Sequence, residues 1–395
     1  MPSARSVETY WQSSSPPLAL RGLASLYAFG WRAYESLYRW GIKRRWVAPV
    51  PVIGVGSLWV GGMSKTPITA ALAQGLAQSG RRVAILTHGY GGTRYRTTTL
   101  IEPNEYPPVE EVGDETLETR TLLPDIPIAV GKWRVPSARQ AIARWEPEVL
   151  VLDDGFQHLP LARTVDLVAL PADEPFGNRY CLPAGPLREP PSGVRRASAI
   201  LGVGGTLESS QKMFEKSQVE TNLTPLCPPS PRAERGEEQG IPPLRLRRGG
   251  KGVRSTPKML SPPIDSLPTF SVRVEPTAWI NLRTHERHPL SFLQGRSVAL
   301  VSAIARPERF VHSVQALGVQ VNATHLFADH HPFQASDLNA IDSKCLVMTL
   351  KDAVKVRPIL PPEVDAYALI ITATFSDAFW GWIFANLPQF QQESR

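Results

Sequence analysis

The sequence predicts an α/β protein with a P-loop NTPase-like parallel sheet domain, a smaller second α/β domain and an N-terminal amphipathic helix. The apolar, β-branched run 50–56 predicts a buried strand, and a glycine-rich loop with Lys65 and an Ala/Leu-rich helix over 67–79 follow it. Short apolar runs that are typical of further parallel strands recur at 82–86, 128–130, 149–152, 165–170 and 199–203. The alternation resumes beyond residue 268, with strands expected at 297–301, 319–321 and 346–349 and a helix at 307–317.

Bulk composition restricts the class of protein without identifying its activity. The 395 residues suffice for two ordinary domains, and a hydrophobic content of 42% supplies a real core. The net charge of +7 suggests an anionic partner, whether nucleic acid, acidic lipid or phosphate. The 3 cysteines are far apart and form no CxxC, so we expect a reducing compartment and neither a disulfide framework nor a zinc site. Arginines interrupt the N-terminal apolar stretch, so we expect no signal peptide and no transmembrane helix.

The N-terminal residues 17–46 have the apolar spacing of one or two helices. Trp31, Trp40 and Trp46 are interleaved with Arg and Lys. Aromatic rings and cations around an apolar face are typical of a helix that lies on an anionic membrane surface. A helix that packs on the core and exposes a basic end has the same pattern, and the sequence alone favours neither reading.

Residues 205–263 break the α/β pattern. Pro, Ser, Gly and Arg dominate there, and 241–260 contain basic residues but no acidic ones. Such a composition cannot bury enough apolar surface to order the chain, so we expect a disordered low-complexity insertion rather than a basic nucleic-acid arm. The expected organisation is an N-terminal membrane-surface helical segment 1–47, a P-loop domain 48–204, the insertion 205–263 and a second α/β domain 264–395.

The strongest local motif runs from Trp59 to Thr66, between the first strand and the helix after it. In a P-loop, backbone N–H groups surround phosphate oxygens, a Lys reaches the β- and γ-phosphates, and a Thr hydroxyl binds Mg²⁺. Lys65 and Thr66 are in place, but Trp59 and Ser64 replace the two glycines of G-x-x-x-x-G-K-[ST]. A glycine-rich turn before a helix is the structural alternative. The candidate nucleotide-binding residues are Trp59, Val60, Gly61, Gly62, Met63, Ser64, Lys65 and Thr66.

Two carboxylates, Asp153 and Asp154, follow the expected strand 149–152. A P-loop protein places its Mg²⁺-binding acid at the end of such a strand. An ordinary turn is the alternative. The Lys-Thr pair upstream favours the metal-binding interpretation.

Three further segments carry polar side chains suited to phosphoryl chemistry. Asp114 and its acidic neighbour could act near an attacking hydroxyl, although the pair also suits a helix N-terminus. Arg188 and Glu189 stand on a Pro- and Gly-rich loop, where an arginine suits phosphate and a surface ion pair is the alternative. A neighbouring aspartate could orient His330, a role that the sequence favours over metal ligation.

In order and spacing, these segments resemble the tetraacyldisaccharide 4'-kinases, also called lipid A 4'-kinases. The family motifs A-P-V-P, G-G-x-G-K-T-P, G-Y-G-G, G-D-E, D-D-G-[FL]-Q-H, L-P-A-G-P-[LM]-R-E, D-H and K-D-A-V-K have counterparts at 48–51, 61–67, 89–92, 113–115, 153–158, 182–189, 329–330 and 351–355. The resemblance covers nearly the whole chain outside 205–263.

The resemblance implies two α/β lobes around a cleft and transfer of the ATP γ-phosphoryl group to the 4'-hydroxyl of an acylated glucosamine disaccharide 1-phosphate. It implies a peripheral protein on the cytoplasmic face of the bacterial inner membrane, with the N-terminal helix touching lipid and with no nucleic-acid partner. It assigns catalysis to Lys65, Asp114, Asp154 and His330, the Mg²⁺ site to Thr66, Asp153 and Gln157, and the substrate side or its surroundings to Glu115, His158, Arg188 and Glu189.

Several residues depart from the family pattern. They are Ser57 for Asn, Ser64 for Gly, His88 for Arg, Thr116 for Pro, Leu350 for Glu, and Ala303 and Ala305 for two glycines. A left-handed backbone at Ser64 would cost about 1 kcal/mol. His88 would remove a fixed positive charge.

Three alternatives stay open. They are another P-loop NTPase, a degenerate family member that binds nucleotide or lipid without transfer, and a nucleic-acid-binding protein that uses the insertion. The sequence leaves the acyl-chain preference and the oligomeric state open.

Overall fold

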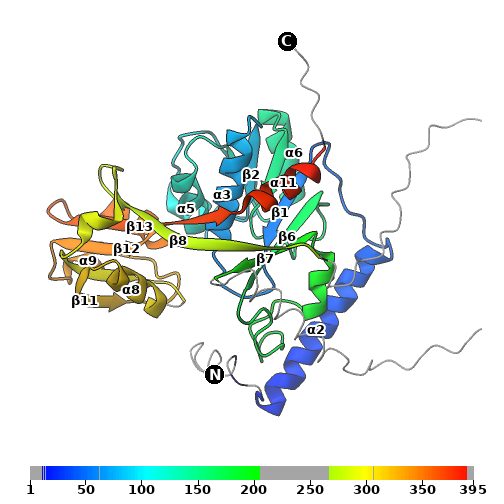
Figure 1. Cartoon of the computed structure of the whole chain (residues 1–395), viewed down its shortest axis with the longest axis horizontal. Coiled ribbons are helices and arrows are strands. Elements are labelled where there is room, and N and C mark those ends of the chain that lie inside the picture. Colours follow the sequence, from blue (N-terminus) through cyan, green and yellow to red (C-terminus); the bar gives the residue numbers. More distant parts are fainter. Residues whose placement is uncertain are drawn as a thin grey trace, which may run out of the picture.

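The computed structural model of the chain describes residues 11, 13, 15–61, 63–204, 267–305 and 307–388. The expected insertion 205–263 and the candidate residue Gly62 lie outside these residues. The described part forms two lobes that share one sheet, with a long helix beside the first lobe (Figure 1).

The first lobe contains the P-loop half of the sheet and the helices around it. Its strands are β1 (Val52–Gly56), β2 (Val83–Thr87), β3 (Thr99–Ile101), β4 (Ile128–Val130), β5 (Val149–Leu152), β6 (Val165–Pro171) and β7 (Ala199–Val203). Its helices are α3 (Lys65–Gln78), α4 (Val109–Val112), α5 (Asp114–Leu122), α6 (Arg134–Trp145) and the 3-10 helix η1 (Pro191–Arg196).

The second lobe follows the undescribed segment. Its strands are β8 (Thr269–Asn281), β9 (Arg287–His288), β10 (Ser297–Ser302), β11 (Gln320–Leu326), β12 (Cys345–Thr349) and β13 (Asp365–Phe375). Its helices are η3 (Leu290–Leu293), α8 (Pro307–Ala316), α9 (Ala335–Asn339), α10 (Leu350–Val356) and η4 (Arg357–Ile359), and α11 (Asp377–Ala385) comes last.

The sheet of the described residues has 13 strands and is mostly parallel. Its order is β11-β10-β12-β13-β8-β7-β6-β1-β5-β2-β4-β3, with β9 paired to β8. The long strands β8 and β13 run antiparallel to each other from the second lobe into the first, where β8 pairs with β7 in parallel (Figure 1). Parallel strands meet at a common carboxyl edge, so the loops after β1 and β5 lie close together.

The core of the first lobe is completed by the end of the chain. Ile68, Leu72 and Leu76 recur at helical spacing on the buried face of α3 and pack with strand residues in one apolar cluster. Phe379 and Ile383 of α11 belong to the same cluster. The last helix therefore returns to the first lobe instead of capping the second.

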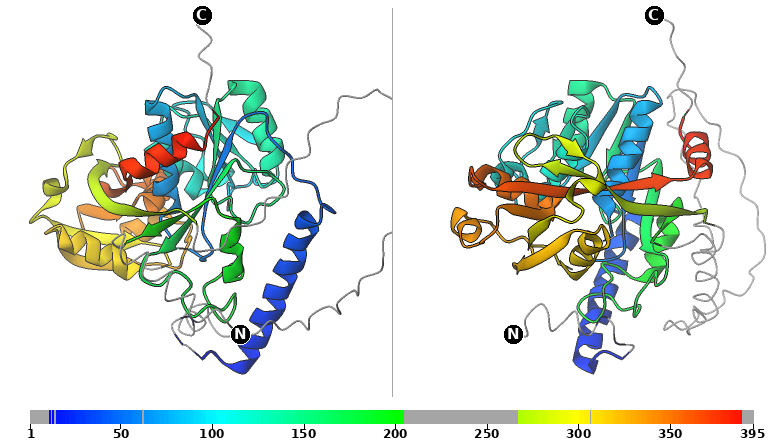
Figure 2. Two further views of the ribbon diagram at one scale, coloured as in Figure 1. Left: turned by 45° about the vertical axis from the view of Figure 1, so that its right-hand side comes forward. Right: turned by 60° about the vertical axis from the view of Figure 1, so that its left-hand side comes forward.

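The helix α2 (Leu18–Arg39) stands along the side of the first lobe (Figure 2). Ala24 is its one fully buried residue. Leu18, Leu26 and Phe29 expose 80%, 67% and 68% of their surface. In the described ranges, no helix has the length and apolar character that crossing a bilayer requires.

The structure confirms the predicted fold class, and most expected strands are present within a residue or two. The strand β8 was not predicted, because Pro276 interrupts its apolar pattern and proline removes a ladder hydrogen bond. The sheet accommodates Pro276 at a register shift opposite Ile370 and Ile371. The four-segment domain division stays a prediction.

The contact between α3 and α11 gives a stability test. A Cβ added at Gly75 would lie 2.2 Å from the Trp380 ring. An alanine in a helix interior normally stabilises relative to glycine by about 0.5–1 kcal/mol. We expect Gly75→Ala to destabilise the fold instead, by about 1–3 kcal/mol in urea unfolding, because the core there is overpacked. In a Trp380→Leu background the same change should become neutral or stabilising, and equal destabilisation in both backgrounds would contradict the packing argument.

Candidate functional site

The loop from Ser57 to Ser64 joins β1 to α3 with a left-handed turn at its end. Ser64 is the N-cap of α3 with φ 50° and ψ 32°, and Gly61 has φ 68°. A left-handed backbone favours glycine, so Ser64 carries a strain of about 1–2 kcal/mol. The sequence-based concern about this position therefore applies to the folded chain.

Part of the loop is anchored in the core rather than open to a ligand. Trp59 and Met63 are buried, and the Trp59 indole N–H donates to the carbonyl of Pro175 at 2.8 Å. The backbone N–H of Val60 donates to the carbonyl of Pro186 at 2.9 Å. The Trp59 side chain, which replaces a P-loop glycine, and the backbone of Val60 thus tie the loop to the segment 175–186.

Two cations meet on Asp154 at the end of β5. The Lys65 ammonium lies 3.3 Å from Asp154 Oδ1, and the Arg188 guanidinium lies 2.7 Å from Oδ2. Burial alone would raise the pKa of Asp154, but Lys65 and Arg188 outweigh it and lower the pKa to about 2. The structure therefore gathers three predicted site residues from separate segments at the mouth of the loop.

Asp153 has a different environment from its neighbour. Its side chain is buried and accepts a hydrogen bond from the Thr69 hydroxyl of α3 at 2.8 Å. Burial, with the charge of Asp154 adding to it, raises the pKa of Asp153 to about 6. Adjacent carboxylates with pKa values pushed apart are typical of functional sites.

The predicted Mg²⁺ residues Thr66, Asp153 and Gln157 offer oxygen donors of the kind this ion prefers. Gln157 Oε1 is buried and has no hydrogen-bond partner within the described part of the chain. No three His, Cys, Asp or Glu side chains of the described residues converge on a point. This donor set fits a magnesium ion that takes one or two protein carboxylates and completes its shell with phosphate oxygens and water.

Glu189 and His158 lie deeper than the sequence suggested. Glu189 has no exposed surface, and its carboxylate accepts hydrogen bonds from Gln157 and Arg196. His158 Nε2 is buried without a hydrogen-bond partner among described residues, and burial lowers the pKa of this ring to about 3. Contact of either side chain with a substrate stays a prediction.

The second group of predicted residues forms where the lobes meet. His330 Nδ1 lies 3.1 Å from Asp114 Oδ2, although the two residues are 216 positions apart. The Lys351 ammonium lies 3.1 Å from His330 Nε2 and 3.8 Å from Glu115 Oε1. An ammonium group can only donate, so Nε2 accepts, and the neutral ring carries its proton on Nδ1, facing Asp114.

The electrostatics of this pair support a carboxylate at Asp114. Burial alone would raise its pKa, but the hydrogen bond from His330 and the charge of Lys351 lower the pKa below the usual range. The same hydrogen bond raises the pKa of His330. Asp114 thus stays ionised at neutral pH and holds the imidazole ring in one orientation.

The pair lies beside the first turn of α3. A hollow of about 50 Å³ is lined by Pro67 of α3, Glu118 of α5 and Thr349 at the start of α10. Glu118 is one helical turn beyond Asp114, and burial raises the pKa of Glu118 to about 8, against the charge of Lys351. The helix α3, which begins with Lys65, packs against α5, which begins with Asp114, so the two groups of site residues are carried by neighbouring helices.

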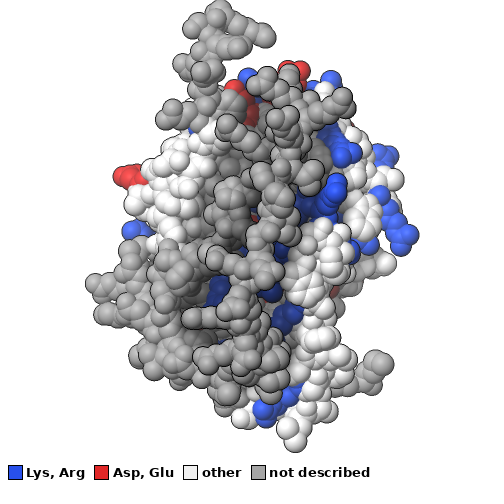
Figure 3. All heavy atoms as spheres, turned by 90° about the vertical axis from the view of Figure 1, so that its right-hand side faces the viewer, with Lys and Arg blue, Asp and Glu red and all other residues white. Residues whose placement is uncertain are grey.

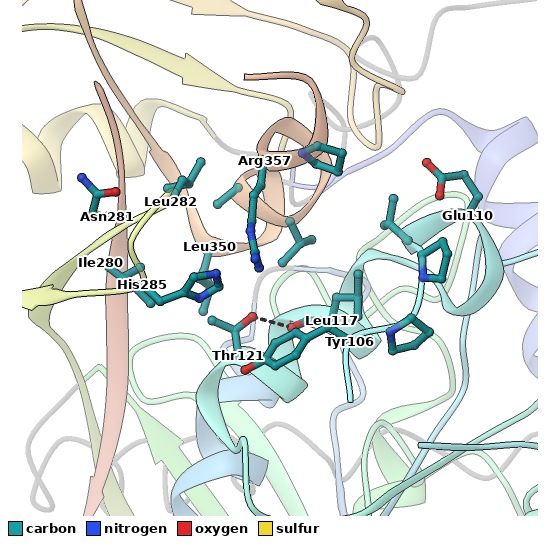
Figure 4. A pocket seen from close by; sticks show the side chains of 16 residues that line it. Tyr106, Glu110, Leu117, Thr121, Ile280, Asn281, Leu282, His285, Leu350 and Arg357 are labelled. Carbon is teal, nitrogen blue, oxygen red and sulfur yellow. Dashed lines mark hydrogen bonds between the residues drawn. The ribbon is translucent and has the colours of Figure 1, made fainter. Parts of the chain in front are cut away.

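A larger hollow of about 460 Å³ lies on the other face of α5 and α10 (Figure 4). Leu117 and Thr121 of α5 line it opposite Leu350 and Arg357, and Tyr106 and His285 line it as well. The predicted site residues are not part of its lining. The two groups of predicted site residues thus lie outside this larger hollow.

Sequence reasoning missed several side chains in the site. Thr69 orients Asp153, and Lys351 lies in a quoted motif to which no role was assigned. Arg134 is a buried cation whose charge acts on Asp154 and Asp153. Burial lowers the pKa of His88 to about 4, with the nearby Arg134 adding to the effect, so the ring is neutral at pH 7. The fixed charge that His88 lacks is thus present nearby on Arg134.

Comparison with known proteins gives a consistent match. A sequence profile of a family described as LpxK, tetraacyldisaccharide-1-P 4'-kinase, matches residues 17–388. A tetraacyldisaccharide 4'-kinase of Anaeromyxobacter dehalogenans (strain 2CP-C) is 36% identical over 366 residues, which cover 89% of this chain and 86% of that protein. One from Pseudomonas entomophila (strain L48) is 32% identical over 383 residues, with 96% and 95% covered.

A solved structure agrees with the sequence matches. The crystal structure of LpxK from Aquifex aeolicus in complex with ATP has a TM-score of 0.69 to this chain at 26% identity. The match covers 93% of this chain and 98% of the other. The similarity therefore includes both lobes.

Substitution by asparagine is expected to change the stability of the protein in opposite directions at Asp153 and at a second buried aspartate, Asp166. The pKa of Asp153 in the folded protein, about 6, lies above the ordinary 3.8, so the folded state favours the protonated form. Its contribution to stability is greatest below pH 4 and is lost as pH rises through 6. We expect Asp153→Asn to stabilise the protein at pH 7.5 by on the order of 2 kcal/mol, and the gain to vanish near pH 4.

Asp166→Asn is the matched control. Burial raises the pKa of Asp166 too, but Asp166 pairs with Arg163 at 2.6 Å, so its removal leaves a buried cation without its carboxylate. Urea unfolding should show destabilisation for Asp166→Asn at both pH values, and stabilisation for Asp153→Asn at pH 7.5 but not near pH 4. Loss of stability in both variants at pH 7.5 would contradict the assigned environment of Asp153.

Proposed function

The chain belongs to the tetraacyldisaccharide-1-P 4'-kinase family, and we propose how its two groups of site residues divide the reaction. The enzyme transfers the γ-phosphoryl group of ATP to the 4'-hydroxyl of a tetraacylated glucosamine disaccharide 1-phosphate, a step of lipid A biosynthesis. ATP with Mg²⁺ is the phosphoryl donor. The family membership does not favour a degenerate protein or another P-loop NTPase.

The donor half consists of the loop after β1 and the residues around Asp154. The cations Lys65 and Arg188 both lie against the carboxylate of Asp154, near the N-terminus of α3. The dipole of α3 also attracts phosphate to this end of the helix. Thr66, Asp153 and Gln157 would hold Mg²⁺. The ion supplies charge neutralisation of the transferred group. The protein contributes orientation and preorganised charge, which dominate phosphoryl transfer.

The acceptor half consists of Asp114, His330 and Lys351. The observation that carries the proposal is the 3.1 Å contact between His330 of the second lobe and Asp114 of the first. The carboxylate of Asp114 accepts a hydrogen bond from the Nδ1–H of His330. Nε2 of the same ring is therefore free to accept the proton of the attacking hydroxyl. Lys351 can turn from Nε2 to Glu115 when the hydroxyl arrives, because it already lies within 4 Å of both groups.

The lipid-anchored acceptor requires a membrane surface, and α2 suits that contact. Leu18, Leu26 and Phe29 are exposed on one side of the helix, and Arg21 and Arg32 flank that side. On the face of the molecule turned toward α2, the visible charged side chains are mostly Lys and Arg (Figure 3). Apolar burial plus cations against anionic lipid favours a peripheral enzyme at the cytoplasmic face of the inner membrane.

The catalytic assignment is tested by transfer of labelled γ-phosphate from ATP-Mg²⁺ to a tetraacylated disaccharide 1-phosphate in detergent. We expect Lys65→Ala and Asp114→Ala each to lower kcat about 10²–10⁴-fold, since the first removes a positive charge that faces the phosphates and the second removes the carboxylate that orients His330. His330→Asn should lower kcat to a similar degree.

His285→Asn is the control for His330→Asn. Both histidines have a left-handed backbone, with φ of 61° and 60°, which asparagine tolerates. His285 lies outside both groups of site residues, so its variant should retain wild-type kcat. A wild-type enzyme without transfer activity would contradict the function, and an active His330→Asn variant would contradict the acceptor half alone.

The membrane assignment is tested by sedimentation with vesicles of phosphatidylethanolamine and phosphatidylglycerol. We expect Leu26→Ser and Phe29→Ser each to weaken vesicle binding about tenfold, since each removes an apolar side chain worth about 1.5–3 kcal/mol when buried. Leu326→Ser changes a similarly exposed leucine of the second lobe and should bind as the wild type does. Unchanged binding of both α2 variants would remove α2 from the membrane contact.

A further inference from the structure

The inner face of α2 contacts the active-site loop once per turn. The Tyr27 hydroxyl donates to the carbonyl of Arg188 at 2.7 Å. The Trp31 indole N–H donates to Glu189 Oε2 at 2.9 Å, and the Glu35 carboxylate lies 3.3 Å from Arg196. The side of α2 that faces the protein therefore contacts residues 188, 189 and 196.

Glu189 connects α2 to the donor half, because its carboxylate accepts hydrogen bonds from both Trp31 and Gln157. It has no exposed surface, and Gln157 Nε2 donates to its Oε1 at 2.8 Å. The same Gln157 group donates to the carbonyl of Ser57, the first residue of the phosphate loop, at 2.9 Å. Arg196 Nη2 donates to Glu189 Oε1 at 3.0 Å, and Nη1 of the same guanidinium lies 2.8 Å from Oε2. One buried carboxylate thus links α2, the phosphate loop and the segment that carries Arg188.

Arg188 itself is held from both sides. Its backbone N–H donates to the carbonyl of Leu58 at 2.7 Å, and its carbonyl accepts from Tyr27 of α2. Its guanidinium reaches Asp154 at 2.7 Å. A shift of α2 would therefore move the main chain from which the guanidinium extends.

The two faces of α2 have separate partners. Leu18, Leu26 and Phe29 lie on the side opposite Trp31 at 3.6 residues per turn, and they are exposed. The side chains that suit a lipid surface are thus distinct from those that contact the loop. Removing an inner contact should leave vesicle binding intact.

We propose that Trp31 and Tyr27 are positioning residues for phosphoryl transfer: from the helix that meets the membrane, they hold Glu189 and the main chain of Arg188, and so set the place of the Arg188 guanidinium. The inference rests on the proposed function, because it assigns Arg188 to the transferred phosphate. The indole N–H of Trp31 satisfies one oxygen of a carboxylate that has no access to water. Its loss leaves that oxygen with the Arg196 guanidinium alone and frees Glu189 and its neighbour to shift.

The test compares Trp31→Phe with Trp133→Phe in the full-length enzyme. Trp31→Phe removes the indole N–H and keeps an aromatic ring, whereas Trp133 is an exposed tryptophan of the first lobe. We expect kcat of Trp31→Phe to fall about tenfold through displacement of the cation, with the KM for lipid in detergent and vesicle binding unchanged. Trp133→Phe should match the wild type in all three measurements.

A double-mutant cycle separates positioning from a general structural role. In an Arg188→Ala background, Trp31→Phe should lower kcat no further, because its effect acts through the missing guanidinium. Tyr27→Phe removes only a hydroxyl from a half-exposed ring, and it should show the same pattern if Trp31→Phe folds poorly. Wild-type kcat in Trp31→Phe and Tyr27→Phe, or an equal loss with and without Arg188, would overturn the inference. Absence of transfer by the wild type would overturn the proposed function instead.

Discussion

The neutralisation of Asp154 by Lys65 and Arg188 is the interaction on which the site depends. The carboxylate is at the end of β5 with a left-handed backbone, φ 47°, and it is partly buried between the two cations, which lower its pKa. Lys65 comes from the start of α3 and Arg188 from a loop that the sheet does not contain. Because a partly buried charge is stabilised by its partners, the ionised Asp154 favours the position in which the loop of Arg188 lies against the phosphate-loop segment. The pair of cations thus orders two segments before any phosphate arrives.

The same principle organises the meeting of the lobes. Asp352 of α10 is buried and accepts hydrogen bonds from the backbone of Ala303 and the hydroxyl of Thr349. Lys355 lies 3.2 Å from Asp352 and 3.9 Å from Asp114 of the first lobe, so this network reaches across the lobes. Asp114 of the first lobe faces His330 and Lys351 of the second. Buried polar networks of this kind accept few alternative arrangements. The long antiparallel strands β8 and β13 bring the lobes together, and these networks select one relative orientation.

The sequence predicted those site residues whose positions follow from the local order of strands, loops and helices. Strand, loop and helix over 50–79 placed Lys65, and the carboxyl-edge rule placed Asp154 beside it. The Asp114–His330 contact joins residues 216 apart, so only the family resemblance suggested it. Glu189 was expected on a displayed loop, yet its burial depends on Trp31, 158 residues away, which no local pattern reveals. The proline within β8 concealed that strand, because proline propensity outweighed the apolar pattern there.

The return of α11 to the first lobe bears on how the protein is made. Phe375, Phe379 and Ile383 complete the apolar cluster that α3 and the central strands begin. A ribosome releases the chain from its N-terminus, so Ile68, Leu72 and Leu76 leave the exit tunnel long before their partners are translated. The core of the first lobe is therefore incomplete during synthesis. Its apolar side chains stay exposed, and prone to aggregation, until residues 377–385 emerge. Nascent chains of this enzyme are expected to depend on chaperones, and a late stop codon removes stability from the phosphate-loop lobe rather than from the lobe in which it falls.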